Sequence, residues 1–343
     1  MSEDFWEEIK QEIDGCLLRL RKGARRNNTW ESMCAYVKGL MSNVPRKNSW
    51  QISKKMGKSS PYSFQYLLYC AKLDRNILQK ELSATTIEKL GKNGILTLDE
   101  IAFPKRGDLS VGTAMQKSKS RIKNAQVGVF LGYGTEQGHT IIDAALHLPE
   151  SWVSNLKRCQ ETGIPEGTVF LNKSEQAIEM LKNFISNGFE CSFVTAGEYY
   201  IECALYMEKN NQPYMIEIPK DSLISIEGKA KRAFKWKTDK EFEIYELDAS
   251  LNKGYKRLLF INGEYFYRIF AKQNITIETI IHVHKSFDLM KNSIKMATSQ
   301  AGLNDYEVRS YQGWNRHIIL SLWALGIFTF LKKKILENKR PQS

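Results

Sequence analysis

The chain has 343 residues, of which 42% are hydrophobic and 26% are charged, a composition ordinary for a globular protein with two or three domains. The formal net charge of +12 indicates a polyanionic partner, nucleic acid in the first place and an anionic membrane surface as the alternative. The six cysteines show no paired Cys-x-x-Cys spacing, which excludes the usual zinc-binding pattern and indicates a reducing compartment, the cytoplasm.

Residues 4 to about 90 are predicted to be helical. From Phe5 to Leu20, apolar residues recur at three- and four-residue spacing, the pattern of an amphipathic helix. This acidic, amphipathic start is unlike a signal peptide. Asn28 or Thr29 is expected to cap the next helix, which is predicted over residues 30–41.

A basic segment follows at residues 44–57 and leads into a predicted helix over about 61–72. Two short helices joined through a glycine turn are compatible with helix-turn-helix DNA binding. An ordinary helical bundle with a solvated basic face fits the same pattern equally well. The residues of this segment expected to contact DNA are Arg46, Lys47, Trp50, Lys54 and Lys55.

Residues 95–104 combine an apolar run with an acidic pair, which is typical of a strand buried on both faces. A carboxylate in such a strand is costly unless a cation or several hydrogen bonds compensate it, so Asp99 is either a metal ligand or a structurally satisfied acid. An acid in the middle of the first of three strands resembles the layout by which RNase H-like nucleases present a metal-binding aspartate. The next strands are predicted over residues 126–133 and 139–149, the latter carrying His139 and Asp143.

The pattern then alternates between helices and strands up to about residue 220. Helices are predicted over residues 174–187 and 198–209, and strands over residues 191–196 and 213–219. Strands that alternate with helices imply a mixed sheet with helices packed on its faces.

Residues 220 to about 275 are predicted to be β-rich. Asn262-Gly263, between two apolar runs, predicts the turn of a type I′ hairpin. Residues 229–237 carry five cations with Phe234 and Trp236 interleaved, the composition of a nucleic-acid contact. A solvated hairpin edge protected by lysines would look the same.

From Ile277 the chain is predicted to be helical to its end. Residues 318–331 are the most membrane-like stretch, but 14 residues are short of the roughly 20 that span a bilayer, so a core helix is predicted. His282 and His284 have no acidic or cysteine partner at metal-ligand spacing, and no metal site is expected there.

Several short motifs, in one order along the chain, resemble the DDE-type transposases of bacterial insertion sequences. Within that group they resemble the insertion sequence 4 superfamily, in the branch typified by insertion sequence 701. The resemblance covers roughly residues 40–330. It rests on Asp99 and on residues 46–51, 105–107, 110–112, 124–131, 148–152, 194–196, 302–310, 313–314 and 316–318.

The resemblance implies an α/β fold, with an RNase H-like mixed sheet, flanking helices, an N-terminal helical domain and a β-rich insertion. It also implies a division of the chain. We expect a helical DNA-binding domain at residues 1–90, the first part of the RNase H-like core at 91–220, the β-rich insertion at 221–276, and C-terminal helices that complete the core at 277–343.

In such transposases three carboxylates hold two Mg²⁺ ions, which activate a water or a 3′-hydroxyl for attack on a DNA phosphodiester. Asp99 matches the first acid. Gly197 occupies the position of the second acid, and Glu198 follows it as a candidate substitute. A glycine supplies no ligand, so the resemblance implies an incomplete site.

The third acid of the family is a glutamate on a helix. Counting back from Gly302 without gaps places Lys291 at that position, and Glu278 and Glu307 are weaker candidates for the ligand. A lysine would bring a positive charge to a site for dications, an interaction of unfavourable sign. The expected function is therefore that of a DNA-binding transposase relative that is defective in DNA cleavage and strand transfer.

Two alternatives stay open from the sequence. One is an active, Mg²⁺-dependent transposase that uses Asp99 with remodelled ligands such as Glu198, and the other is a transposase-derived protein-interaction module without DNA binding. The expected partner is DNA, at element ends or related sequences. A homodimer is compatible with the resemblance, and no membrane partner is expected. The remaining residues expected to contact DNA are Lys105, Arg106, Lys119, Arg121, Lys123, Lys231, Arg232, Lys235, Trp236 and Arg309.

Overall fold

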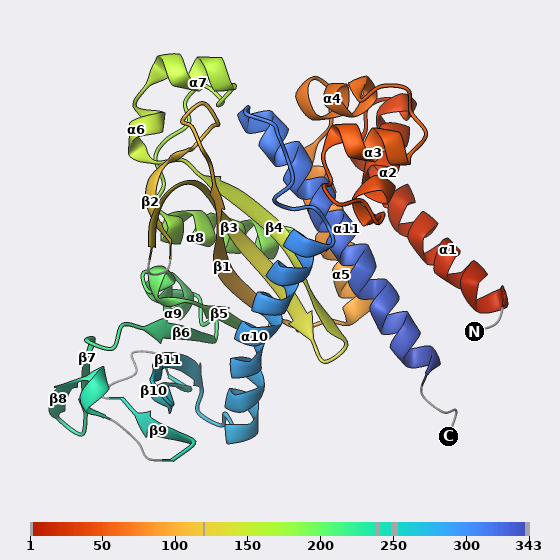
Figure 1. The fold of residues 1–343 in the computed structure, drawn as a ribbon. Coiled ribbons are helices and arrows are strands. Elements are labelled where there is room, and N and C mark those ends of the chain that lie inside the picture. Colours follow the sequence, from red (N-terminus) through yellow and green to blue (C-terminus); the bar gives the residue numbers. More distant parts are fainter. Residues whose placement is uncertain (1–2, 119–120, 237–239, 248–252, 340–343) are drawn as a thin grey trace. The chain divides into compact units, whose positions relative to one another are not determined.

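A computed structural model describes residues 3–118, 121–236, 240–247 and 253–339 of the chain (Figure 1). The chain forms two compact units. Unit 1 comprises residues 1–92, 100–171 and 290–343, and unit 2 comprises residues 93–99 and 172–289. Strand β1 (Ile95–Pro104) and helix α10 (Ile277–Ser299) each contribute residues to both units.

Unit 1 is rich in helices, and the helical prediction for the first ninety residues is confirmed. The expected cap of the second helix is wrong, because this helix begins at Asn27 and the preceding Arg26 makes no side-chain capping hydrogen bond. The helices of unit 1 besides α10 are α1 (Glu3–Arg19), η1 (Leu20–Gly23), α2 (Asn27–Met41), α3 (Ser49–Lys55), α4 (Tyr62–Tyr69), α5 (Arg75–Leu90), α6 (Glu150–Val153), α7 (Leu156–Thr162) and α11 (Tyr311–Asn338).

The 28-residue helix α11 runs through the core of unit 1. It packs against α2, α4, α5 and strand β4 (Gly138–His147). The indole Nε1 of Trp323 donates to the carbonyl oxygen of Leu78 at 3.2 Å, so this fully buried side chain also satisfies its polar atom. The prediction of a core helix over residues 318–331 is confirmed. Of the described helices, none is long and apolar enough to cross a membrane.

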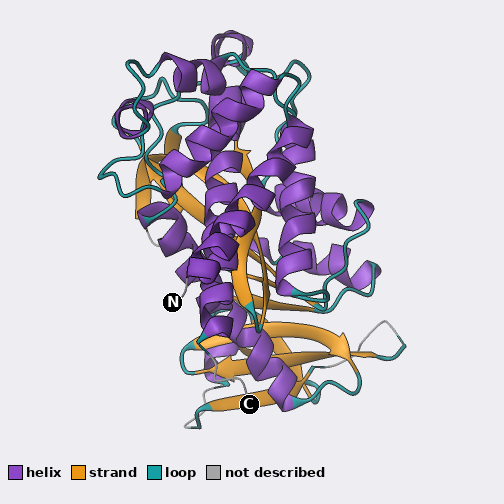
Figure 2. Ribbon diagram, turned by 90° about the vertical axis from the view of Figure 1, so that its right-hand side faces the viewer, coloured by secondary structure: helices purple, strands orange, loops and turns teal. Residues whose placement is uncertain are grey.

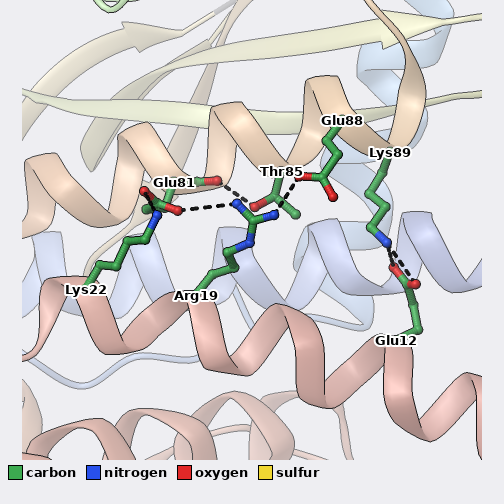
Figure 3. Close-up of polar contacts among 7 residues, drawn as sticks. All are labelled: Glu12, Arg19, Lys22, Glu81, Thr85, Glu88 and Lys89. Atoms are coloured by element: carbon green, nitrogen blue, oxygen red, sulfur yellow. Dashed lines mark hydrogen bonds and ion pairs between the residues drawn. The ribbon is translucent and has the colours of Figure 1, made fainter.

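Ion pairs fasten α1 and η1 to α5 (Figure 3). The Arg19 guanidinium lies 2.6 Å from the Glu88 carboxylate and 3.7 Å from that of Glu81, which also binds Lys22 at 2.7 Å. Lys89 on α5 pairs with Glu12 on α1 at 2.8 Å. Because most of these side chains are partly exposed, each pair contributes on the order of 0–1 kcal/mol, and the network mainly fixes the register of the two helices.

In unit 1 the strand order is β2-β3-β1 with β4 also paired to β3, and both β2 and β4 are antiparallel to β3. β2 (Ala114–Ser118) was not expected from the sequence, whereas β3 (Arg121–Thr135) and β4 confirm the predicted strands. The imidazole of His139 on β4 lies against Gly132 and Gly134 on β3. A Cβ added at these glycines would come within 2.6 and 2.5 Å of ring atoms, so the close approach requires glycine.

Unit 2 contains a mixed sheet in the order β1-β5-β6-β11-β10-β9. Strands β1, β5 and β6 are parallel to one another. β11 is antiparallel to β6, β10 is antiparallel to β11, and β9 is antiparallel to β10. The strands are β5 (Phe193–Ala196), β6 (Tyr214–Ile218), β9 (Phe242–Glu246), β10 (Tyr255–Asn262) and β11 (Tyr265–Lys272), with a separate hairpin of β7 (Leu223–Ile226) and β8 (Lys229–Arg232). The helices besides α10 are α8 (Lys173–Ser186), η2 (Glu198–Tyr200), α9 (Cys203–Lys209) and η3 (Ala233–Lys235).

The predicted fold class is confirmed as a mixed α/β protein with a large mixed sheet and flanking helices (Figure 2). One detail of the β-rich region is corrected. The hairpin of β10 and β11 pairs Asn262 with Tyr265, so the two turn residues are Gly263 and Glu264. Gly263 has a φ of +57°, and Glu264 has no positive φ, a pattern of signs that matches a type II′ turn and differs from the expected type I′ turn.

Candidate functional site

Two of the candidate catalytic positions lie in unit 2, where the parallel pairing of β1 with β5 ends. β1 and β5 pair in the register Thr97 with Thr195 and Leu98 with Ala196. The strand of Asp99 therefore neighbours the strand that ends at Ala196. The next residues along the two strands are Asp99 and Gly197. Side chains alternate along a strand, so positions 99 and 197 belong to the same face of the sheet as the two threonines.

Helix α10 covers this face through a chain of buried hydroxyl groups. Thr195 Oγ1 lies 2.9 Å from Thr97 Oγ1 and 2.8 Å from Oγ of Ser286 on α10. All three side chains are at least 98% buried. Thr195 belongs to the motif at residues 194–196, whereas Thr97 and Ser286 carried no signal in the sequence. The hydroxyl chain connects α10 to β1 and β5 two residues before positions 99 and 197.

Gly197 directly follows β5 and brings no carboxylate to the position beside Asp99. Its backbone is extended, with φ −71° and ψ 173°, which any residue can adopt. A Cβ added there would meet no other heavy atom within 4 Å. Neither backbone conformation nor packing therefore requires glycine at this position. Glu198 begins the helical turn η2 directly after it, so its side chain departs from a turn and does not continue the strand alternation.

The third expected position and its substitutes lie elsewhere in the chain. Lys291 is exposed on the part of α10 that belongs to unit 1. Glu278 lies in the first turn of α10, and Glu307 pairs with Arg46 at 3.2 Å and accepts a hydrogen bond from Asn48 at 3.1 Å. Within the described ranges no group of three or more His, Cys, Asp or Glu side chains is placed to hold a metal ion.

The donor set at positions 99 and 197 does not fit a two-metal centre of the kind that the resemblance implies. Mg²⁺ binds hard oxygen ligands in near-octahedral geometry, and the resemblance implies a carboxylate from each of the two strands. Asp99 supplies a half-buried carboxylate, and position 197 supplies none. No reaction step can be derived through a metal pair at this position.

The basic segment around α3 is exposed, with one exception. Arg46, Lys54 and Lys55 are exposed, and Trp50 is 62% exposed. Lys47 is only 6% exposed, and its ammonium group donates to the carbonyl oxygens of Leu40 and Ser42 at 2.6 and 2.5 Å. Burial lowers the pKa of Lys47. Its expected role in contacting DNA is therefore corrected, because it holds the segment to α2.

A second basic region of unit 1 brings two of the sequence motifs together. The ammonium group of Lys105 lies 4.0 Å from the centroid of the Tyr306 ring, and burial lowers its pKa to about 8. The backbone N–H of Val111 donates to the carbonyl oxygen of Arg309 at 2.9 Å. The side chains of Arg106, Lys123 and Arg309 are exposed. Arg121 begins β3, and Lys119 lies outside the described residues.

The aromatic and basic run of unit 2 is partly structural. The ring of Trp236 lies 5.6 Å from that of Tyr245 and packs on a small buried cluster around Ala233. Lys231 lies 4.9 Å above the Trp236 ring, and Arg232 donates to a backbone carbonyl at 2.6 Å. Lys235 is exposed, and the last cation of the run, Lys237, lies outside the described residues. Trp236 is thus engaged in packing, while the cations beside it remain at the surface.

The family model described as DDE superfamily endonuclease matches residues 19–233, more than half of the chain. No curated protein sequence matches this chain. Among solved structures, the fold is similar to that described as the cryo-EM structure of piggyBac transposase synaptic complex with hairpin DNA. The TM-score is 0.51 at 10% sequence identity, over 98% of this chain and 75% of that one. The fold likeness agrees with the family match, and the chain belongs to the DDE superfamily endonuclease family.

Proposed function

We propose that this chain is a DNA-binding protein of the insertion-sequence transposase type that has lost DNA cleavage and strand transfer. The observation that carries the proposal is the pairing of β1 with β5, which sets Asp99 beside a glycine at the position of the second acid. A carboxylate would fit at Gly197 without strain, so its absence leaves an otherwise preserved strand pair with one acid. Lys291, at the third position by motif order, adds a charge that opposes dications.

DNA binding is supported by charge and by the fold. The net charge is +12, and exposed cations are found on α3, around β3 and on the β7–β8 hairpin. The structurally similar piggyBac transposase was solved in a synaptic complex with hairpin DNA. A folded surface that carries many unpaired cations attracts a polyanion, and DNA is the polyanion on which this family acts.

We expect no DNA cleavage by the purified protein with Mg²⁺ or Mn²⁺. Supercoiled DNA that carries the ends of its own element should be nicked no faster than in the presence of the Asp99→Ala variant. Gel electrophoresis of the nicked and linear forms measures the result. Nicking by the natural protein that disappears in Asp99→Ala would overturn the proposal and favour Glu198 as a replacement ligand, to be tested with Glu198→Gln.

The same proposal is tested by restoring the missing ligand. The Gly197→Asp variant should bind Mn²⁺ at least about tenfold more tightly than the natural protein in calorimetric titrations, equivalent to ~1.4 kcal/mol. Gly197→Asn, of the same shape but without charge, serves as the control and should show no gain. The gain should also vanish when Asp99→Ala is added. A gain that survives this addition would show that the new carboxylate does not work together with Asp99.

The salt dependence of DNA affinity tests the second basic region of unit 1. Changing Arg106, Lys123 and Arg309 to glutamine should weaken DNA binding and reduce the slope of log K against log salt by about 0.9 per lost phosphate contact. Fluorescence anisotropy with a labelled duplex at several salt concentrations measures it. As a control, Lys10, Lys157 and Lys182, each paired with an acid on its own helix, are changed to glutamine. Equal slopes for the two triple variants would remove this region from the DNA interface.

A further inference from the structure

A cavity of about 800 Å³ in unit 1 is lined by residues that no motif of the sequence connects. Its walls come from the segment before α2, the start of α5, strand β4 and the first turns of α11. Four of the lining side chains are cations: Arg25, Lys72, Arg75 and Arg316. The one acid of the lining, Asp74, accepts a hydrogen bond from the N–H of Ile77 at 3.0 Å and caps α5. The cavity is therefore strongly positive.

Most of this charge has no acidic partner in the fold. Arg75 pairs with the buried carboxylate of Asp143 at 2.7 Å. In the part of the chain that the structure describes, Arg25, Lys72 and Arg316 form no ion pair with an acid. Three cations that face one cavity repel one another, an arrangement that costs free energy until an anion enters.

Among these cations, Arg316 is the one whose uncompensated charge costs the most free energy. It is 9% exposed, and its guanidinium donates to the carbonyl oxygen of Leu68 at 2.9 Å and to Oε1 of Gln312 at 3.0 Å. These bonds orient the group but do not neutralise it, and an arginine keeps its charge when buried. Burial lowers its pKa, as desolvation of an uncompensated cation does. A planar guanidinium with free donors is suited to bidentate binding of a phosphate.

We propose that this cavity binds successive phosphates of the DNA backbone, with Arg316 as the fixed donor and Arg25 and Lys72 as the outer cations. The proposal rests on the proposed DNA-binding function, because DNA supplies the phosphate. The arrangement favours phosphate over a single carboxylate, since a phosphodiester chain brings successive charges to the inner and the outer cations together. It assigns to Arg316 a role in ligand binding in addition to its hydrogen bond to α4.

The test compares two double variants with equal loss of charge. Arg25→Gln with Lys72→Gln removes the outer cations of the cavity, and both residues are exposed, so the fold should be retained. Arg26→Gln with Lys80→Gln is the control, because these exposed residues lie close to Arg25 and Lys72 in the sequence but do not line the cavity. Duplex DNA affinity is measured over a range of salt, and thermal stabilisation is measured with pyrophosphate as a small probe.

The cavity variant should reduce the salt slope by about 1.8, corresponding to two lost contacts, and should lose the stabilisation by pyrophosphate. The control should retain both. Identical behaviour of the two variants in the DNA assay would overturn the cavity proposal while leaving DNA binding intact. If the natural protein bound no DNA, the proposed function would be refuted. If pyrophosphate still stabilised it through the cavity in that case, the cavity would bind phosphate from a source other than DNA. Stabilisation by polyglutamate and not by pyrophosphate would refute phosphate as the ligand class.

Discussion

Replacing Glu208 by alanine is expected to lower the free energy of unfolding of unit 2 by about 3–5 kcal/mol. Its carboxylate, 9% exposed, accepts hydrogen bonds from the Tyr214 hydroxyl at 2.7 Å and from Nε of Arg257 at 3.0 Å, and it pairs with Arg268 at 3.4 Å. Alanine would leave two arginines and a buried hydroxyl without this acceptor. Breaking a buried ion pair on one side is costly because the remaining charges are still desolvated.

The pKa of Glu208 gives this prediction a pH signature. Burial raises the pKa, but the hydrogen bonds from Arg257 and Tyr214 and the charges of both arginines outweigh it, so the pKa lies below its usual value of 4.5. A carboxyl whose pKa is depressed in the folded state stabilises above the unfolded pKa, and this stability is lost as the pH falls through the folded value. The Glu208→Ala penalty should therefore be full at pH 7 and should shrink below about pH 4.5.

Urea unfolding followed by circular dichroism and by fluorescence measures the effect, with both signals required to agree on the transition of unit 2. Glu208→Gln, which keeps an acceptor of similar shape, should cost less than alanine. The double change Glu208→Leu with Arg257→Leu should also cost less than Glu208→Ala, because it leaves one arginine without its acid where Glu208→Ala leaves two. A loss below about 1 kcal/mol for Glu208→Ala would contradict the assigned importance of the cluster.

Elements whose sequence carries a strong local signal were predictable. The helix over residues 174–187 is observed as α8, and its start is fixed by a capping box in which Asn172 and Glu175 exchange hydrogen bonds. The strands around Asp99 and before Gly197 were predicted from two apolar runs, and they are observed as β1 and β5. Burial of α11 followed from an apolar run too short for a bilayer.

Features that depend on distant contacts were not predictable. β2 has only two apolar residues among AMQKS, so its conformation is set by backbone pairing with β3 and not by its own pattern. Lys47 carries a charge in the sequence, but its burial depends on two carbonyl groups at the end of α2. The cations of the cavity come from separate segments, so their convergence on Arg316 appears only in the fold.

At the candidate site, the sequence indicated which acid is missing, and the structure shows whether an acid could be accommodated there. The order of motifs identified Gly197 as the position of a missing acid. The structure adds that an aspartate would fit there, because the backbone is extended and the space is open. The hydroxyl chain from Thr97 to Ser286 could not be read from the sequence, since it joins residues that are 189 positions apart.

Acidification from pH 7 to pH 5 is expected to destabilise unit 1 by about 4 kcal/mol through two buried histidines. His139 hydrogen-bonds to Ser293 Oγ through Nδ1 at 2.8 Å, and burial lowers its pKa to about 3. His317 hydrogen-bonds to Tyr36 through Nδ1 at 2.9 Å, and burial lowers its pKa to about 4, against backbone hydrogen bonds that raise it. At pH 5 both imidazoles therefore stay mostly neutral in the folded chain.

The sign follows from proton binding in the two states. An unfolded histidine titrates near 6.5, so below that pH the unfolded chain takes up protons that the folded chain does not, and stability falls as the pH falls. At pH 5 each histidine is about 1.5 pH units below its unfolded pKa, which corresponds to about 2 kcal/mol. This value depends little on the folded pKa values, because both lie below 5.

Urea unfolding at pH 7, 6 and 5 measures the loss. The variants His139→Gln and His317→Gln should be less stable than the natural protein at pH 7, because each disturbs a packed hydrogen bond, but each should remove about half of the change between pH 7 and pH 5. His282→Gln, at an exposed position on α10, is the control and should leave the pH dependence as it is. If the buried variants kept the full pH dependence of the natural protein, the loss would have to come from other groups. If stability were unchanged down to pH 5, the two imidazoles would have to be accessible to protons in the folded chain, which their burial among Gly132, Gly134 and Tyr36 opposes.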